Sequence, residues 1–161
     1  MRLSGPLGQE ERTGLINDIE QTPALFRSLV KGLSDAQLDT PYRPGGWTIR
    51  QVVHHVPESH MNAYIRFKLA VTEDNPTIKP YEEARWAELA DGRTEPIATS
   101  LDLLEALHKR WVVFLRLMSA SDFGRTYFHP DMKSDVTLDQ ALAIYGWHGK
   151  HHAEHIRQAL R

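Results

Sequence analysis

The sequence predicts an all-α protein, a four-helix bundle with a long crossover connection. Apolar residues recur with helical spacing in four long stretches, over 9–31, 48–71, 99–119 and from 137 to the end. The segment 72–98 between the second and third stretches contains three prolines and a glycine, which is too broken for a long helix. Four long helices with a long middle connection are typical of a bundle with a crossover.

The first helix is expected from Gln9 to Lys31, and Gly32 is a plausible stop signal. Pro23 lies inside it, so we expect a kink or a split there. A short helical turn over 34–38 and a loop over 39–46 lead to the second long helix.

Thr48 is a suitable N-cap for the second helix, which runs to about Val71 with a bend expected at Pro57. Within the crossover we expect one short helix at 81–89. Thr99, with Asp102 three residues later, resembles the cap of the third helix.

Residues 124–136 are too short and broken for a helix and predict a small hairpin around Pro130–Lys133. The last helix is expected to start near Thr137 and to run to the end of the chain. We interpret the whole chain, 1–161, as a single domain, because this length can bury a core of its own.

Composition excludes several classes of function. The net charge of −2 gives no basis for binding nucleic acid or an anionic membrane. Cysteine is absent, which excludes disulfides, zinc–thiolate sites and cysteine nucleophiles. No stretch approaches the roughly 20 apolar residues of a membrane span, and the first residues lack the apolar run of a signal peptide. We therefore expect a cytoplasmic protein.

Histidine is the unusual residue: there are nine, and four of them fall between His148 and His155. On the last helix, His148 and His152 are one turn apart and lie within the apolar stripe, whereas His151 and His155 lie toward its edge. The inward pair is close enough to share a metal ion. Neutral imidazole is a good ligand for zinc, nickel or copper.

The second long helix supplies a third candidate ligand, His55. A polar line continues from it beside the buried face, the pattern of a cavity wall, and consists of Ser59, Asn62 and Arg66. His54 points away from this line. His60 lies closer to the apolar face, where a polar core residue is an equally good interpretation.

Simpler interpretations exist for most of these side chains. A single histidine at a helix edge is usually solvated or hydrogen-bonded to a neighbour, and this is our expectation for four of them: His54, His108, His129 and His151. His155 either lines a pocket or caps the helix end, where a cation is favoured. Trp47 is expected in the core or in a pocket wall. The inward pair could also be buried core histidines with polar partners.

Several sequence motifs resemble a known family. They are GGWTIRQVVHH at 45–55, SHMN at 59–62, IRFK at 65–68 and YGWHGKHHAEHI at 145–156. Together with TPYR at 40–43 and YFHP at 127–130, they resemble the YfiT branch of the DinB-like proteins, a branch described as metal-dependent hydrolases. The resemblance covers nearly the whole chain, and the joint order and spacing of the motifs are specific.

The resemblance implies a four-helix bundle with one histidine ligand from the second helix and two from the last. The tryptophan-to-ligand spacing selects His55 over His54, and the H-x-x-x-H spacing selects His148 and His152. It also implies one divalent ion per chain, zinc or alternatively nickel, in a cytoplasmic homodimer. Some relatives are S-transferases that use low-molecular-weight thiols such as bacillithiol.

We therefore expect a metal-dependent hydrolase that acts on a small molecule with a metal-activated water. The alternatives are a thiol S-transferase using the same ligands and a non-enzymatic, metal-bound stress or interaction protein. Five residues are candidates for the substrate pocket: Trp47, Ser59, Asn62, Arg66 and His155. The sequence shows no unambiguous general base.

Overall fold

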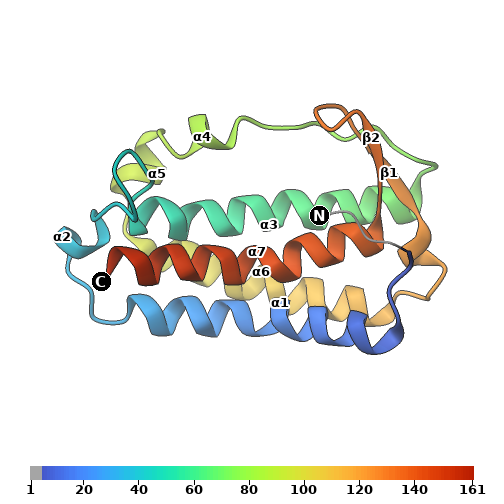
Figure 1. The fold of residues 1–161 in the computed structure, drawn as a ribbon, viewed down its shortest axis with the longest axis horizontal. Helices are drawn as coiled ribbons and strands as arrows, with labels where there is room; N and C mark the ends of the chain where they lie inside the picture. The colour runs from blue at the N-terminus through green and yellow to red at the C-terminus, as the bar shows by residue number, and fades with distance from the viewer. Residues whose placement is uncertain (1–4) are drawn as a thin grey trace.

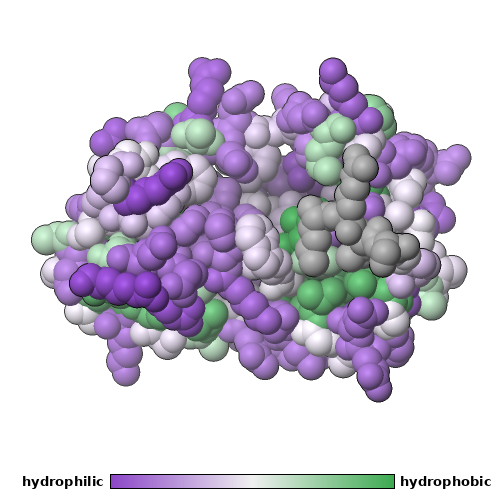
Figure 2. Space-filling model, in the orientation of Figure 1, coloured by the Kyte–Doolittle hydropathy of each residue, from purple (hydrophilic) through white to green (hydrophobic). Residues whose placement is uncertain are grey.

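The structure is a computed structural model that describes residues 5–161, and it confirms the four-helix bundle (Figure 1). The long helices are α1 (Gln9–Val30), α3 (Ile49–Thr72), α6 (Ile97–Leu117) and α7 (Leu138–Ala159). None of the helices in this part of the chain is long and apolar enough to cross a membrane. The face in Figure 2 is mainly hydrophilic, with hydrophobic residues exposed in small patches.

The connection between α3 and α6 is the predicted crossover. α1 and α3 each pack against both α6 and α7, so the consecutive helices α1 and α3 lie diagonally across the bundle. Figure 1 shows that α3 and α6 run in the same direction, so the chain returns along the outside of the bundle between them. This return carries two short helices, α4 (Glu83–Trp86) and α5 (Ala90–Thr94). The prediction of one short helix at 81–89 is therefore wrong in extent.

Polar side chains cap three helices, and the cap at Thr48 confirms the prediction. Ser34 caps the short helix α2 (Asp35–Leu38), Thr48 caps α3, and Thr137 caps α7, each in a reciprocal arrangement with a glutamine three residues later. The start predicted for α6 is wrong. The helix begins at Ile97 because Pro96, with φ of −59°, already has the backbone angle that suits a helix start.

Both internal prolines lie inside continuous helices, so of the kink or split expected at Pro23 the split is excluded. Proline has no N–H to donate to the carbonyl four residues earlier. In α1 that carbonyl belongs to Ile19, and His108 of α6 donates its Nδ1–H to it at 2.6 Å. A neighbouring helix thus supplies the hydrogen bond that the proline removes.

The predicted hairpin is present. After a 3₁₀ turn (Asp122–Gly124), strands β1 (Thr126–His129) and β2 (Ser134–Thr137) pair antiparallel, with Tyr127 opposite Val136, and both of these side chains are buried. The start of the crossover is attached to β1, because Ile78 N–H donates to the Phe128 carbonyl and Phe128 N–H donates to the Pro76 carbonyl. The hairpin therefore holds the crossover in place.

The apolar core has two parts. One cluster lies toward the hairpin end and includes Phe67, Trp111 and Leu142. The other lies toward the opposite end and includes Phe26 and Leu104. On α3, α6 and α7 the residues between the two clusters include buried or half-buried histidines, so a polar layer crosses the middle of the bundle.

Candidate metal centre

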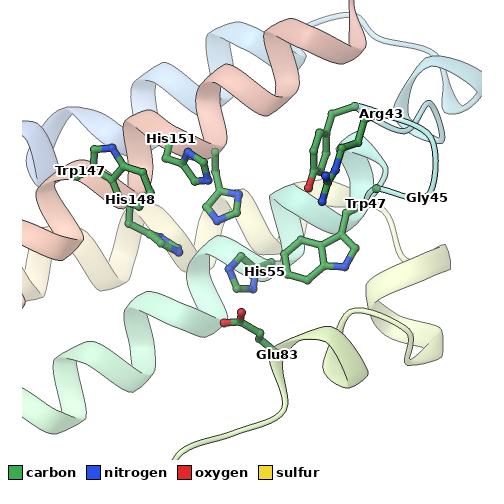
Figure 3. A pocket seen from close by; sticks show the side chains of 11 residues that line it. Arg43, Gly45, Trp47, His55, Glu83, Trp147, His148 and His151 are labelled. Atoms are coloured by element: carbon green, nitrogen blue, oxygen red, sulfur yellow. The ribbon is translucent and has the colours of Figure 1, made fainter. Parts of the chain in front are cut away.

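The structure brings His55 of α3 together with His148 and His152 of α7. Each ring offers one nitrogen, and these three nitrogens lie within 4.8 Å of one another. The ring centroids are 4.5 Å apart for His148 and His152, and 4.8 Å apart for His55 and His152. Figure 3 shows the imidazoles of the two helices facing a common space. A single ion can bridge groups at this spacing after small movements of the rings.

Two glycines on α7 help to set the position of this helix against α1. A Cβ on Gly149 would stand 2.6 Å from Thr22 Oγ1 and 2.8 Å from Thr22 Cγ2. A Cβ on Gly146 would stand 2.7 Å from Leu15 Cδ2. Because glycine has no Cβ, α7 approaches α1 closely on that side, while His148 and His152 face α3 on the other.

Burial keeps the three rings neutral. Burial first, and the neighbouring imidazoles second, lower the pKa of His55 to about 4 and that of His148 to about 3. The pKa of His152 is also lowered, first by burial and then by His148. A neutral imidazole has the lone pair that a metal ion needs.

The cluster also fits a cation because one of its three rings has a buried nitrogen without a hydrogen-bond partner among the described residues. His55 Nδ1 is buried and forms no hydrogen bond within residues 5–161. Buried polar atoms in native proteins nearly always have a partner. Three neutral imidazoles, one of them with such an unsatisfied nitrogen, suit a borderline-soft divalent ion such as zinc or nickel.

A cavity of about 440 Å³ opens directly over the three histidines. Trp47, predicted as a pocket residue, forms part of its wall, with its ring centroid 4.7 Å from that of His55. Tyr42 and Glu83 also line it, and in Figure 3 the Glu83 carboxylate points toward the histidines. An open cavity over the ligands is typical of catalytic rather than structural metal sites.

His155 lies beside this cavity rather than in its lining. Its ring stacks on Tyr42, with centroids 4.0 Å apart, and its Nδ1 is 3.3 Å from His152 Nδ1. His155 therefore contacts His152 on one side and packs against Tyr42 on the other. The predicted role as a pocket residue is replaced by this contact.

Ser59 and Arg66 line a second cavity, of about 430 Å³, together with Tyr81 and Tyr145. Glu83 lines both cavities, so the second cavity adjoins the first beneath the crossover. The prediction for Asn62 is wrong, because it is outside the lining of both cavities. Its amide instead donates to the Glu58 carbonyl on the same helix.

Two features escaped the sequence interpretation, the position of Glu83 and the burial of His108. Glu83 lies on the crossover, and no periodic pattern indicates which crossover carboxylate reaches the cavity. His60 and His108 are fully buried and hydrogen-bonded to each other. His60 is thus a polar core residue, one of the interpretations that its position near the apolar face allowed, whereas His108 was expected at a helix edge. His54, as expected, is hydrogen-bonded to neighbours outside the site, Ser100 and the Glu95 carbonyl.

Comparison with known proteins identifies the family. The family model described as "DinB superfamily" matches residues 18–156. "Putative metal-dependent hydrolase YfiT" of Bacillus subtilis is 46% identical, covering 100% of this chain and 96% of that protein. A metal-dependent hydrolase, also named as putative, of Oceanobacillus iheyensis is 56% identical over 88% of this chain and 81% of its own length.

The fold matches a solved structure as well. YfiT from Bacillus subtilis, described as "a probable metal-dependent hydrolase with an unusual four-helix bundle topology", superimposes with a TM-score of 0.96 at 46% identity. The match covers 99% of this chain and 91% of that chain. On sequence and on fold alike, this chain belongs to the DinB superfamily.

Proposed function

We propose that the protein is a metal-dependent hydrolase whose single divalent ion is held by His55, His148 and His152. The observation that carries this is the convergence of three neutral imidazoles on the floor of an open cavity. The ligand cluster found in residues 5–161 has three members, which leaves coordination positions for water and substrate. Relatives named as metal-dependent hydrolases support the same reaction class.

When bound, a divalent ion in such a site lowers the pKa of water toward neutrality and polarises a substrate carbonyl or phosphoryl oxygen. The chain itself must supply a proton acceptor. Glu83 is the residue in the cavity wall that suits this role, because its carboxylate points toward the histidines. Trp47 forms another part of the wall, with an apolar surface that restricts water.

The second cavity suits an anionic part of a small-molecule substrate. Arg66 is 8% exposed, and its hydrogen bond within the described residues is a long one, 3.4 Å to Tyr145 Oη. Tyr81 Oη is buried in the same cavity and has no hydrogen-bond partner within residues 5–161. A buried guanidinium without a carboxylate partner is costly, and a carboxylate or phosphate of the substrate would compensate it.

The test is hydrolysis of a panel of esters, amides and phosphoesters, with and without an acidic group, by untagged protein loaded with zinc or nickel. We expect metal-dependent turnover that is lost in His152→Ala and reduced by about 10²–10⁴-fold in Glu83→Gln. Glu73→Gln, an exposed glutamate at the end of α3, is the matched control and should keep full activity. Arg66→Leu should raise KM for the acidic substrates only.

The same preparation separates the alternative functions. Conjugation of a low-molecular-weight thiol to monochlorobimane, lost in His152→Ala, would instead identify a thiol S-transferase. Full metal occupancy with turnover of neither substrate class would indicate a metal-bound stress or interaction protein. The open cavity argues against the last of these, because a purely structural ion is usually enclosed by protein ligands.

A further inference from the structure

A row of imidazoles crosses the bundle from the proposed metal centre to the opposite helix. His148 Nδ1 is 2.9 Å from His60 Nε2, and His60 Nδ1 is 2.8 Å from His108 Nε2. His108 Nδ1 is in turn 2.6 Å from the Ile19 carbonyl oxygen. The row thus links α7, α3, α6 and α1 through one chain of hydrogen bonds.

The hydrogen bond at the His108 end of the row determines which nitrogen of each of the three rings carries the proton. A carbonyl oxygen only accepts, so His108 Nδ1 must carry a proton and donate it. A neutral His108 then accepts at Nε2, which requires the proton of His60 to be on Nδ1. By the same argument His60 accepts at Nε2, so His148 carries its proton on Nδ1. His148 Nε2 is left as the one nitrogen in this ring with a free lone pair.

Geometry and burial both favour this order. The ring planes of His60 and His108 are parallel to within 5°, and a centroid separation of 4.9 Å with an N···N distance of 2.8 Å suits a nearly linear N–H···N hydrogen bond. His60 is 0% exposed and His108 is 1% exposed, so water cannot substitute for either partner. Burial of both rings disfavours the charged form, which keeps each of them a single donor and a single acceptor.

The anchor of the row exists because of Pro23. In an uninterrupted helix, the N–H of residue 23 would donate to the Ile19 carbonyl. Proline has no N–H, so the carbonyl is free to accept from His108 across the interface between α1 and α6. Pro23, a helix breaker by sequence, thus leaves the Ile19 carbonyl free to accept the hydrogen bond that orients the whole row.

We propose that His60 and His108 are positioning residues that hold His148 in the tautomer with Nε2 free for the metal, anchored at the Ile19 carbonyl. This proposal rests on the proposed three-histidine site. A ligand histidine usually donates its second nitrogen directly to a carboxylate, a carbonyl or water, and that contact fixes its tautomer and orientation. Here two further imidazoles transmit the same constraint from the opposite side of the bundle.

The first test uses metal-free protein and needs no reaction. Long-range ¹H–¹⁵N correlation spectra at pH 7 report which nitrogen of each histidine carries the proton. We expect His60, His108 and His148 all to be protonated on Nδ1. In His60→Leu, His148 loses its acceptor and should populate the other tautomer. Protonation of His148 on Nε2 in the wild-type protein would overturn the proposal.

The second test measures zinc affinity by competition with a chelator. His60→Leu should weaken binding by about 10- to 100-fold. His60→Gln should retain most of the affinity, because its amide oxygen can accept from His148 and its NH₂ group can donate to His108. His54→Leu is the matched control. It removes another buried histidine of α3 whose partners lie outside the row, and it should leave affinity unchanged.

The outcomes separate this proposal from the proposed function. A folded His60→Leu protein with wild-type zinc affinity would contradict the role of the row. If that variant does not fold, the His60→Gln affinity and the wild-type spectra decide the matter. A wild-type protein that binds no divalent ion would overturn the metal site itself, while the spectra would still establish or refute the order of protons.

Discussion

Burial and hydrogen-bond partners determine whether each buried histidine of this molecule carries a charge. His108 shows this most simply, since it forms no hydrogen bond to a proposed ligand and donates to a backbone carbonyl. Burial lowers its pKa to about 4, although the hydrogen bond to Ile19 opposes the shift. In the unfolded chain its pKa would be near 6.5.

This difference predicts a pH dependence of stability. Between about pH 6.5 and pH 4 the unfolded state binds a proton at His108 that the folded state does not, so the free energy of unfolding falls as pH is lowered through that window. Urea unfolding of the metal-free protein at several pH values measures this slope. In His108→Gln, which cannot gain the proton, the slope should be shallower. An identical slope in both proteins would refute the assignment.

At the residue scale the sequence identified the ligand candidates and missed part of their surroundings. His148 and His152 could be predicted because a 3.6-residue period places them on the same face of one helix. Glu83 could not, because it lies on a connection with no period. The link between His108 and Ile19 could not be predicted either, since it depends on which helices are neighbours.

At the scale of elements, the contact between α7 and α1 determines where the two ligands of α7 lie. Gly149 sits between them in sequence and faces Thr22, where a Cβ would come within 2.6 Å of Oγ1. Thr22 is buried and its side chain is branched at Cβ, so it has little freedom to move aside. The glycine is therefore required by packing, not by helix propensity.

Gly149→Ala should destabilise the protein by about 1–3 kcal/mol, despite the better helix propensity of alanine, because of overpacking against Thr22. Gly14→Ala is the control. Gly14 also lies inside a long helix, and nothing is within 4 Å of its Cβ position, so this change should stabilise by about 0.5–1 kcal/mol. Thermal unfolding of the two variants gives the comparison, and equal effects of the same sign would contradict the proposed packing.

Helix boundaries were predictable where a polar cap marks them and less so elsewhere. Thr48 and Thr137 begin their helices as predicted, because their hydroxyls accept from backbone N–H groups that have no partner within the helix. The start of α6 was misplaced, because Pro96 provides a suitable backbone angle but no side-chain cap. Of the kink or split expected in α1, the split does not occur, and the carbonyl that Pro23 leaves without a donor accepts from His108 of another helix.

At the scale of the whole molecule, the crossover both completes the bundle and covers the site. The length and proline content of residues 72–98 predict the crossover. They do not predict that the two helices it connects, α3 and α6, pack against each other. Its attachment to the hairpin and its passage along the outside of the bundle place Glu83 over the histidines. The homodimer and the identity of the ion stay predictions. Size-exclusion chromatography with light scattering tests the homodimer.

Imidazoles from α3 and α7 are proposed to hold one ion between them. Elemental analysis of untagged protein, purified without added metal, tests this proposal most directly. We expect about one divalent ion per chain in the wild type and in His54→Ala, whose side chain is hydrogen-bonded to Ser100 away from the site. His55→Ala should lose most of it. A metal-free wild type, or a His55→Ala protein that retains the full complement, would contradict the account.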